Sequence, residues 1–114
     1  MIKVNWDVEE LVALLDIYER TSSGQIHDLT EELEKLSVVL IKRADLLGIS
    51  HDDKFRNLNG LKMMYQNLLY VMSGGECGLS AASRALYDVC DFRKKCPIVF
   101  EMLLSEFNRR YRKS

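Results

Sequence analysis

The sequence predicts an all-α fold, a single compact bundle of about five helices. Apolar residues recur at spacings of three and four along almost the whole chain, and the alternation typical of strands is absent. No proline interrupts this pattern before Pro97. The 114 residues, 47% of them hydrophobic, fit one domain with a core of its own. We therefore assign residues 1–114 to one helical domain.

The first two helices are predicted from their end signals and their apolar stripes. Asp7 followed by Glu10 is a capping-box pattern with aspartate in the first position. Asp28 is the expected N-cap of the second helix, and Gly48 stands where a left-handed residue closes a helix. The expected ranges are residues 7–20 and residues 29–47.

The three later helices follow polar or glycine-rich segments. Asn59 is the expected N-cap of the third helix, and Ser80 caps the fourth. Pro97 suits the first position of the fifth helix, because its missing N–H would have no partner there. The expected ranges are residues 60–72, 81–94 and 97–111.

Composition and patterning favour a cytoplasmic protein without a membrane span. The apolar runs, such as residues 68–72, are too short to cross a bilayer, and acidic residues arrive too early for a signal peptide. Residues 1–40 hold nine acidic and three basic side chains, whereas residues 41–114 hold eight acidic and thirteen basic ones. Such asymmetry fits either a side that faces a polyanion or an ordinary mixed surface.

The sequence offers no catalytic or metal-binding motif, so we expect no enzyme, no metal and no cofactor. The three cysteines include no CxxC pair, and "SHDD" at residues 50–53 brings only one histidine to its two aspartates. A GxSxG elbow is absent, and "SGGECG" at residues 73–78 lacks the spacing and the lysine of a phosphate loop.

The clearest functional candidate is "DKFRNLNGLKMMYQNLLY", residues 53–70. It places basic and amide side chains, which contact phosphates and base edges, before and along the start of an apolar helix. The second and third helices would form a helix-turn-helix-like pair, with the third in the reading position and a longer connection than that motif uses. Alternatively, Arg56 and Asn57 hydrogen-bond the loop's own backbone and hold the helix start.

The basic end "NRRYRKS" adds cations that either grip phosphates or complement the dipole of a last helix. Double-stranded DNA is thus one expected partner. The candidate DNA-binding residues are Arg56, Asn57, Asn59, Lys62, Gln66, Arg109 and Arg110.

A protein-interaction module is the alternative. Met63, Leu69 and Tyr70 are apolar residues on the third helix that can dock a partner protein. The module would then be a homodimer, a subunit of a larger complex or a phage-encoded inhibitor of a bacterial defence protein.

The segments "WDVEELVALLDIYER", "FRNLNGLKMMYQNLLY" and "GLSAASRALYDV" resemble the N-terminal helical domain of bacterial HNH-type and modification-dependent restriction endonucleases. The resemblance implies a non-enzymatic accessory domain of a DNA restriction or anti-phage defence system, with weak DNA contact and a nuclease as a partner. The catalytic HNH segment has no counterpart here, and Met64 replaces a frequent lysine or arginine. The matching residues are Trp6, Glu9, Glu10, Phe55, Arg56, Asn57, Asn59, Gly60, Met63, Asn67, Gly78, Leu79 and Ser80.

Overall fold

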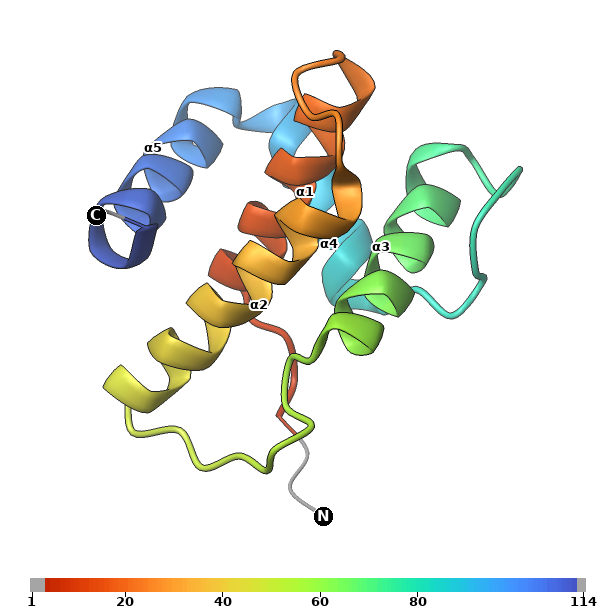
Figure 1. Ribbon diagram of the computed structural model, residues 1–114. Coiled ribbons are helices and arrows are strands. Elements are labelled where there is room, and N and C mark those ends of the chain that lie inside the picture. The colour runs from red at the N-terminus through yellow and green to blue at the C-terminus, as the bar shows by residue number, and fades with distance from the viewer. Residues whose placement is uncertain (1–3, 113–114) are drawn as a thin grey trace.

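Five α-helices and one short π-helical turn make up most of residues 4–112, the part of the chain that the computed structural model describes (Figure 1). No strand forms within this part, so the predicted all-α class is confirmed. The elements are α1 (Val8–Ser22), α2 (Leu29–Leu46), α3 (Leu58–Met72), α4 (Arg84–Lys95), α5 (Pro97–Phe107) and the π-helical turn η1 (Asn108–Arg112).

Helix α1 is the central helix, because it packs against each of the other four α-helices. Val12 and Ala13 are as buried as Leu14 and Leu15, with exposed fractions of 0%. Val8, at the start of the helix, is 52% exposed. The first helix is therefore covered on most of its circumference rather than along one stripe, as expected of a helix enclosed by others.

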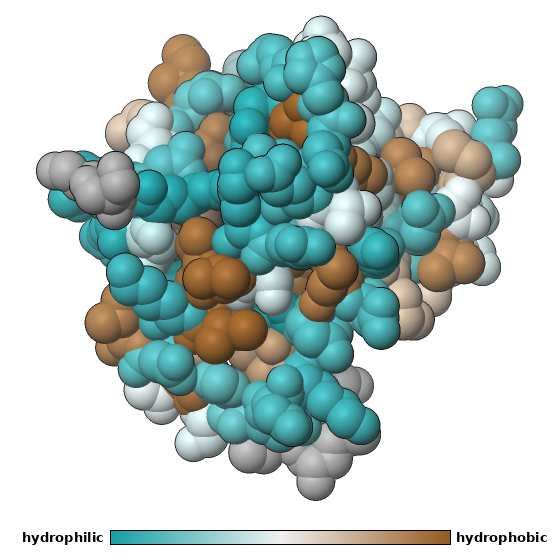
Figure 2. All heavy atoms as spheres, in the orientation of Figure 1, coloured by the Kyte–Doolittle hydropathy of each residue, from teal (hydrophilic) through white to brown (hydrophobic). Residues whose placement is uncertain are grey.

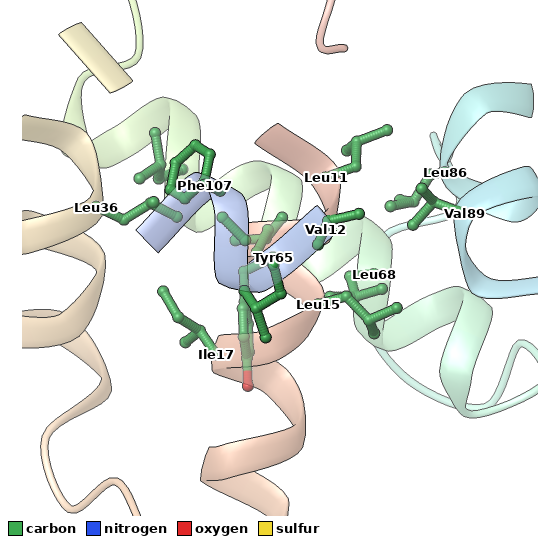
Figure 3. Packing of buried hydrophobic residues seen from close by; sticks show 14 of the residues in the cluster. Leu11, Val12, Leu15, Ile17, Leu36, Tyr65, Leu68, Leu86, Val89 and Phe107 are labelled. Carbon is green, nitrogen blue, oxygen red and sulfur yellow. The ribbon is translucent and has the colours of Figure 1, made fainter. Parts of the chain in front are cut away.

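One hydrophobic core joins all five helices (Figure 3). Side chains from α2, α3, α4 and α5 converge on α1, and burial of each large one contributes roughly 1.5–3 kcal/mol. The residues labelled in the close-up are Leu11, Val12, Leu15, Ile17, Leu36, Tyr65, Leu68, Leu86, Val89 and Phe107.

The predicted starts of α1 and α2 are confirmed, whereas those of α3 and α4 are wrong. Asn57, not Asn59, caps α3, and its Oδ1 accepts a hydrogen bond from the Gly60 N–H at 2.8 Å. Helix α4 begins at Arg84 rather than at residue 81, with Ser83 as its N-cap in place of Ser80.

The basic end of the chain continues α5 in a wider turn. The α-helix ends at Phe107 and passes into η1, instead of remaining α-helical to residue 111. Tyr111 packs against Phe107 with ring centroids 5.3 Å apart, and the Arg43 guanidinium of α2 lies 5.6 Å from the Tyr111 ring centre. These contacts hold η1 against α2.

Candidate interaction surfaces

Arg56, the first residue proposed to contact DNA, is buried in an ion pair. Its side chain is 7% exposed, and that of Glu10 is 3% exposed. The Arg56 Nε donates to Glu10 Oε2 at 2.7 Å, and Nη2 donates to Glu10 Oε1 at 2.9 Å. This is the two-point geometry in which guanidinium and carboxylate bind most strongly.

Other N–H groups of the Arg56 guanidinium also donate hydrogen bonds within the chain. Its Nη1 and Nη2 donate to the backbone carbonyls of Val4 and Asn5 at 3.3 and 3.2 Å. The guanidinium carbon lies 4.5 Å from the ring centre of Trp6 and 4.4 Å from that of Phe55. Arg56 therefore joins the segment before α3 to the start of α1, which corrects its assignment to a DNA-binding surface.

Asn57 also serves local structure, because its side-chain oxygen caps α3. The structure thus favours the local alternative for Asn57. The side chain of Arg56 instead binds α1 and the segment before it, rather than the backbone of its own loop. The carbonyl of Arg56 adds to this, since it accepts a hydrogen bond from Ser37 Oγ of α2 at 2.6 Å.

The other predicted DNA-binding residues are exposed, but they lie in two separate regions of the surface. Asn59, Lys62 and Gln66 lie along the first turns of α3. Arg109 and Arg110 lie in η1, where Arg109 pairs with Glu106 at 2.8 Å. Among the helices described, α3 packs against α1, α2 and α4 only, and it lies on the other side of the bundle from α5 and η1 (Figure 1). The predicted set therefore does not form one face.

The three predicted protein-docking residues do not form one patch either. Met63 is 61% exposed, whereas Leu69 and Tyr70 are half-buried. The cause is the segment 73–80, which folds back so that the Leu79 N–H donates to the Gln66 carbonyl at 3.0 Å.

Helix α5 carries an exposed apolar surface that the sequence analysis did not identify. Ile98, Val99 and Met102 are 76%, 47% and 63% exposed, and we call them the α5 patch. Ile98 and Met102, but not Val99, line an open groove of about 640 Å³. The other residues of its lining are Arg93, Pro97, Glu101, Ser105 and Glu106. The signal was present in "PIVFEMLLSEF", which holds more apolar residues than one buried face of a short helix needs.

A second apolar surface runs along α2. Val38 and Leu46 are 68% and 64% exposed, and Ile41 between them is half-buried; we call these three the α2 stripe. They line an open groove of about 490 Å³ together with Lys42 and Asp45. Figure 2 shows hydrophobic residues gathered over the region of α2 among hydrophilic ones.

The acidic, histidine and cysteine side chains of residues 4–112 bear on whether a metal or a reactive thiol could act here. In residues 4–112, no group of three or more His, Cys, Asp or Glu side chains is placed to hold a metal ion. Burial raises the pKa of the Cys90 thiol to about 11, which keeps it neutral, and Cys77 and Cys96 are exposed free thiols.

Comparisons of the chain with protein-family models, with curated proteins and with solved structures found no match. Between residues 4 and 112, none of the helices has the length and the apolar character that crossing a membrane requires.

Proposed function

We propose that the chain is a non-enzymatic protein-interaction module that binds a helix of a partner protein along α5. The observation that carries this proposal is the α5 patch, because a helix that is apolar on both its inner and outer sides is normally covered on both. An amphipathic helix that lays its apolar ridge into a groove is a common mode of such recognition.

The groove beside the α5 patch lies next to the junction of α4 and α5, and contacts at this junction fix the position of α5. Arg93 of α4 donates to Glu19 of α1 at 3.0 Å, and its guanidinium lies 5.0 Å from the ring centre of Phe100. These contacts fix the start of α5 on the bundle, so little reorganisation would accompany binding.

The border of the groove suggests the chemistry of the partner helix. Ile98 and Met102 are one helical turn apart, which suits residues one turn apart on the partner. The side chain of Glu101 is 58% exposed and lies 3.7 Å from Arg93, at the limit of an ion pair. A lysine or arginine beside the apolar ridge of the partner would complement this carboxylate.

Site-specific photocross-linking in the cells that produce the protein tests this proposal. A photoreactive side chain in place of Met102 should give one defined cross-linked product, which Ile98→Asp abolishes. The matched control carries the photoreactive group in place of Met63, which is equally exposed but lies on α3. A product that persists with Ile98→Asp, or that forms equally from both positions, would refute the proposal.

Weak DNA contact in a restriction or anti-phage setting is a second proposal, which rests on the sequence resemblance. Its support in the structure is the exposure of Asn59 and Lys62 near the amino-terminal end of α3, where helix dipole and side chains both favour a phosphate. Gln66 is exposed one turn further along the helix. Arg56 and Asn57 no longer contribute to it.

Fluorescence anisotropy with a DNA duplex at low and at physiological salt tests this second proposal. Binding should be detectable at low salt, weaken steeply with salt and decrease in Lys62→Ala. No binding at low salt, or equal binding by Lys62→Ala, would exclude a DNA contact through α3.

A further inference from the structure

We infer that the α2 stripe binds a second copy of this chain, with the two α2 helices antiparallel about a two-fold axis that passes near Val38. The inference concerns a different helix from α5 and does not depend on the proposed function. It starts from the exposure of Val38 and Leu46, which place an apolar surface on a helix whose other face is already buried in the core.

The charges of α2 indicate what covers this surface. Its charged side chains form ion pairs within residues 4–112, with two exceptions, Glu34 and Lys42. Both exceptions are exposed. Glu34 lies four residues before Val38 and Lys42 lies four residues after it, so the two opposite charges stand one turn to either side of the most exposed residue of the stripe.

Such an arrangement is complementary to itself. In an antiparallel pair centred on Val38, Glu34 of each copy faces Lys42 of the other, so the same ion pair forms twice. The two Val38 side chains meet at the axis, and Ile41 lies against the aliphatic part of Lys35 of the second copy. An apolar centre bordered by charged groups is the usual composition of a protein interface.

The same register brings two carboxylates of like charge opposite each other, and a partner within each chain lessens their repulsion. Glu31 of one copy would lie opposite Asp45 of the other, and both carboxylates have partners within their own chain. Lys35 lies 3.7 Å from Glu31, and His51 lies 2.7 Å from Asp45.

The size of the contact indicates a weak, reversible dimer. Helix α2 has 18 residues, about 27 Å of helix, and one pair of such helices buries less surface than the roughly 800 Å² per partner of a stable complex. The dimer should therefore dissociate on dilution.

Charge exchange tests the inference by sedimentation equilibrium. Glu34→Lys alone and Lys42→Glu alone each convert two attractive pairs into two repulsive ones, so each should weaken self-association about tenfold. The two single variants mixed in equal amounts should form a mixed dimer as tight as the wild-type dimer, because both cross-chain pairs are then attractive again. Val38→Asp should abolish association, and Met102→Asp on α5 should leave it unchanged.

Circular dichroism confirms that each variant is folded, which these exposed positions should allow. A wild-type chain that remains monomeric up to millimolar concentration would overturn the inference. Failure of the mixture to associate more tightly than either single variant would overturn it as well, because the antiparallel register requires that rescue.

Discussion

The guanidinium of Arg56 and the carboxylate of Glu10 illustrate how one buried pair can determine a local structure. Both groups are almost fully removed from water, and each meets its partner in two short hydrogen bonds. Removal of one partner leaves the charge of the other buried and unpaired, which lowers the free energy of unfolding strongly. Replacement of both partners by apolar residues changes it much less. Arg56 also adopts a positive φ of 48°, so the contacts of its side chain hold a backbone conformation that is rare outside glycine.

Arg56→Met should therefore lower the free energy of unfolding by about 3–5 kcal/mol, because Glu10 loses the buried cation that pairs with it. The matched control is Lys62→Met, the removal of an exposed cation, which should change stability by less than about 0.5 kcal/mol. Urea unfolding followed by circular dichroism measures both. Equal effects of the two changes would contradict the structural role of Arg56.

His51 gives the stability a dependence on pH. Its Nδ1 lies 3.0 Å from the Asp52 carbonyl and its Nε2 lies 2.7 Å from Asp45 Oδ1, so only the doubly protonated ring can donate to both acceptors. The backbone contact with Asp52 is the largest cause that raises the pKa of His51, followed by the hydrogen bond to Asp45.

Because this pKa is higher in the folded than in the unfolded chain, the stabilisation is complete below the unfolded value of about 6.5. It is lost as the pH rises through the folded value. Urea unfolding across this range should show the decrease in the wild type and in His27→Gln, whose own ring is exposed, but not in His51→Gln. The same slope in all three proteins would show that another group is responsible.

At the scale of elements, two helix starts show why the predicted caps were displaced. Ser80 and Ser83 both precede helix-forming residues, and local sequence does not distinguish them. The Leu79 N–H donates to the Gln66 carbonyl of α3, which ties this part of the chain to α3 and delays the start of α4 until Ser83 can cap it. Asn57 caps α3 in the same way, directly after the position that Arg56 anchors.

Gly78 is the residue that lets the segment 73–80 approach α3. A Cβ at this position would lie 2.2 Å from the Gln66 carbonyl oxygen and 2.7 Å from the Tyr70 nitrogen, both backbone atoms of a packed helix. Gly78→Ala should therefore displace the segment and destabilise the protein. Gly74→Ala has a similar positive φ of 69° but no atom within 4 Å, so it should cost only the backbone strain of about 1–2 kcal/mol.

Thermal unfolding together with limited proteolysis of the 73–80 segment compares the two glycine variants. Faster cleavage is expected for Gly78→Ala alone. Cleavage of Gly74→Ala at the same rate would assign the effect to backbone conformation rather than to the close approach of the segment to α3.

At the scale of the whole molecule, the fold class was predictable and the surfaces were not. Periodicity is a local property, so "LTEELEKLSVVLIKRADL" indicates a helix whatever surrounds it. The burial of Arg56 instead depends on Glu10, which is 46 residues away in the sequence, and on the ring of Trp6. The exposure of Ile98 likewise depends on which side of α5 meets α1, and no spacing within the helix determines that.

The last prediction compares a core residue of α5 with a residue of the exposed α5 patch. Phe100 and Ile98 lie two residues apart in α5, but Phe100 is 0% exposed whereas Ile98 is 76% exposed. Phe100→Ala should lower the free energy of unfolding by about 3–5 kcal/mol through the cavity it leaves. Ile98→Asp should change the free energy of unfolding by less than about 0.5 kcal/mol, because its side chain contributes little to the core.

Urea unfolding of both variants at low chain concentration measures these effects without a contribution from self-association. A large effect of Phe100→Ala and a small effect of Ile98→Asp would mean that the α5 patch is not required for folding. The apolar side chains of the patch would then be explained by the binding of a partner. If Ile98→Asp destabilised the monomer as strongly as Phe100→Ala, the patch would belong to the core and the proposed docking of a partner helix would lose its main support.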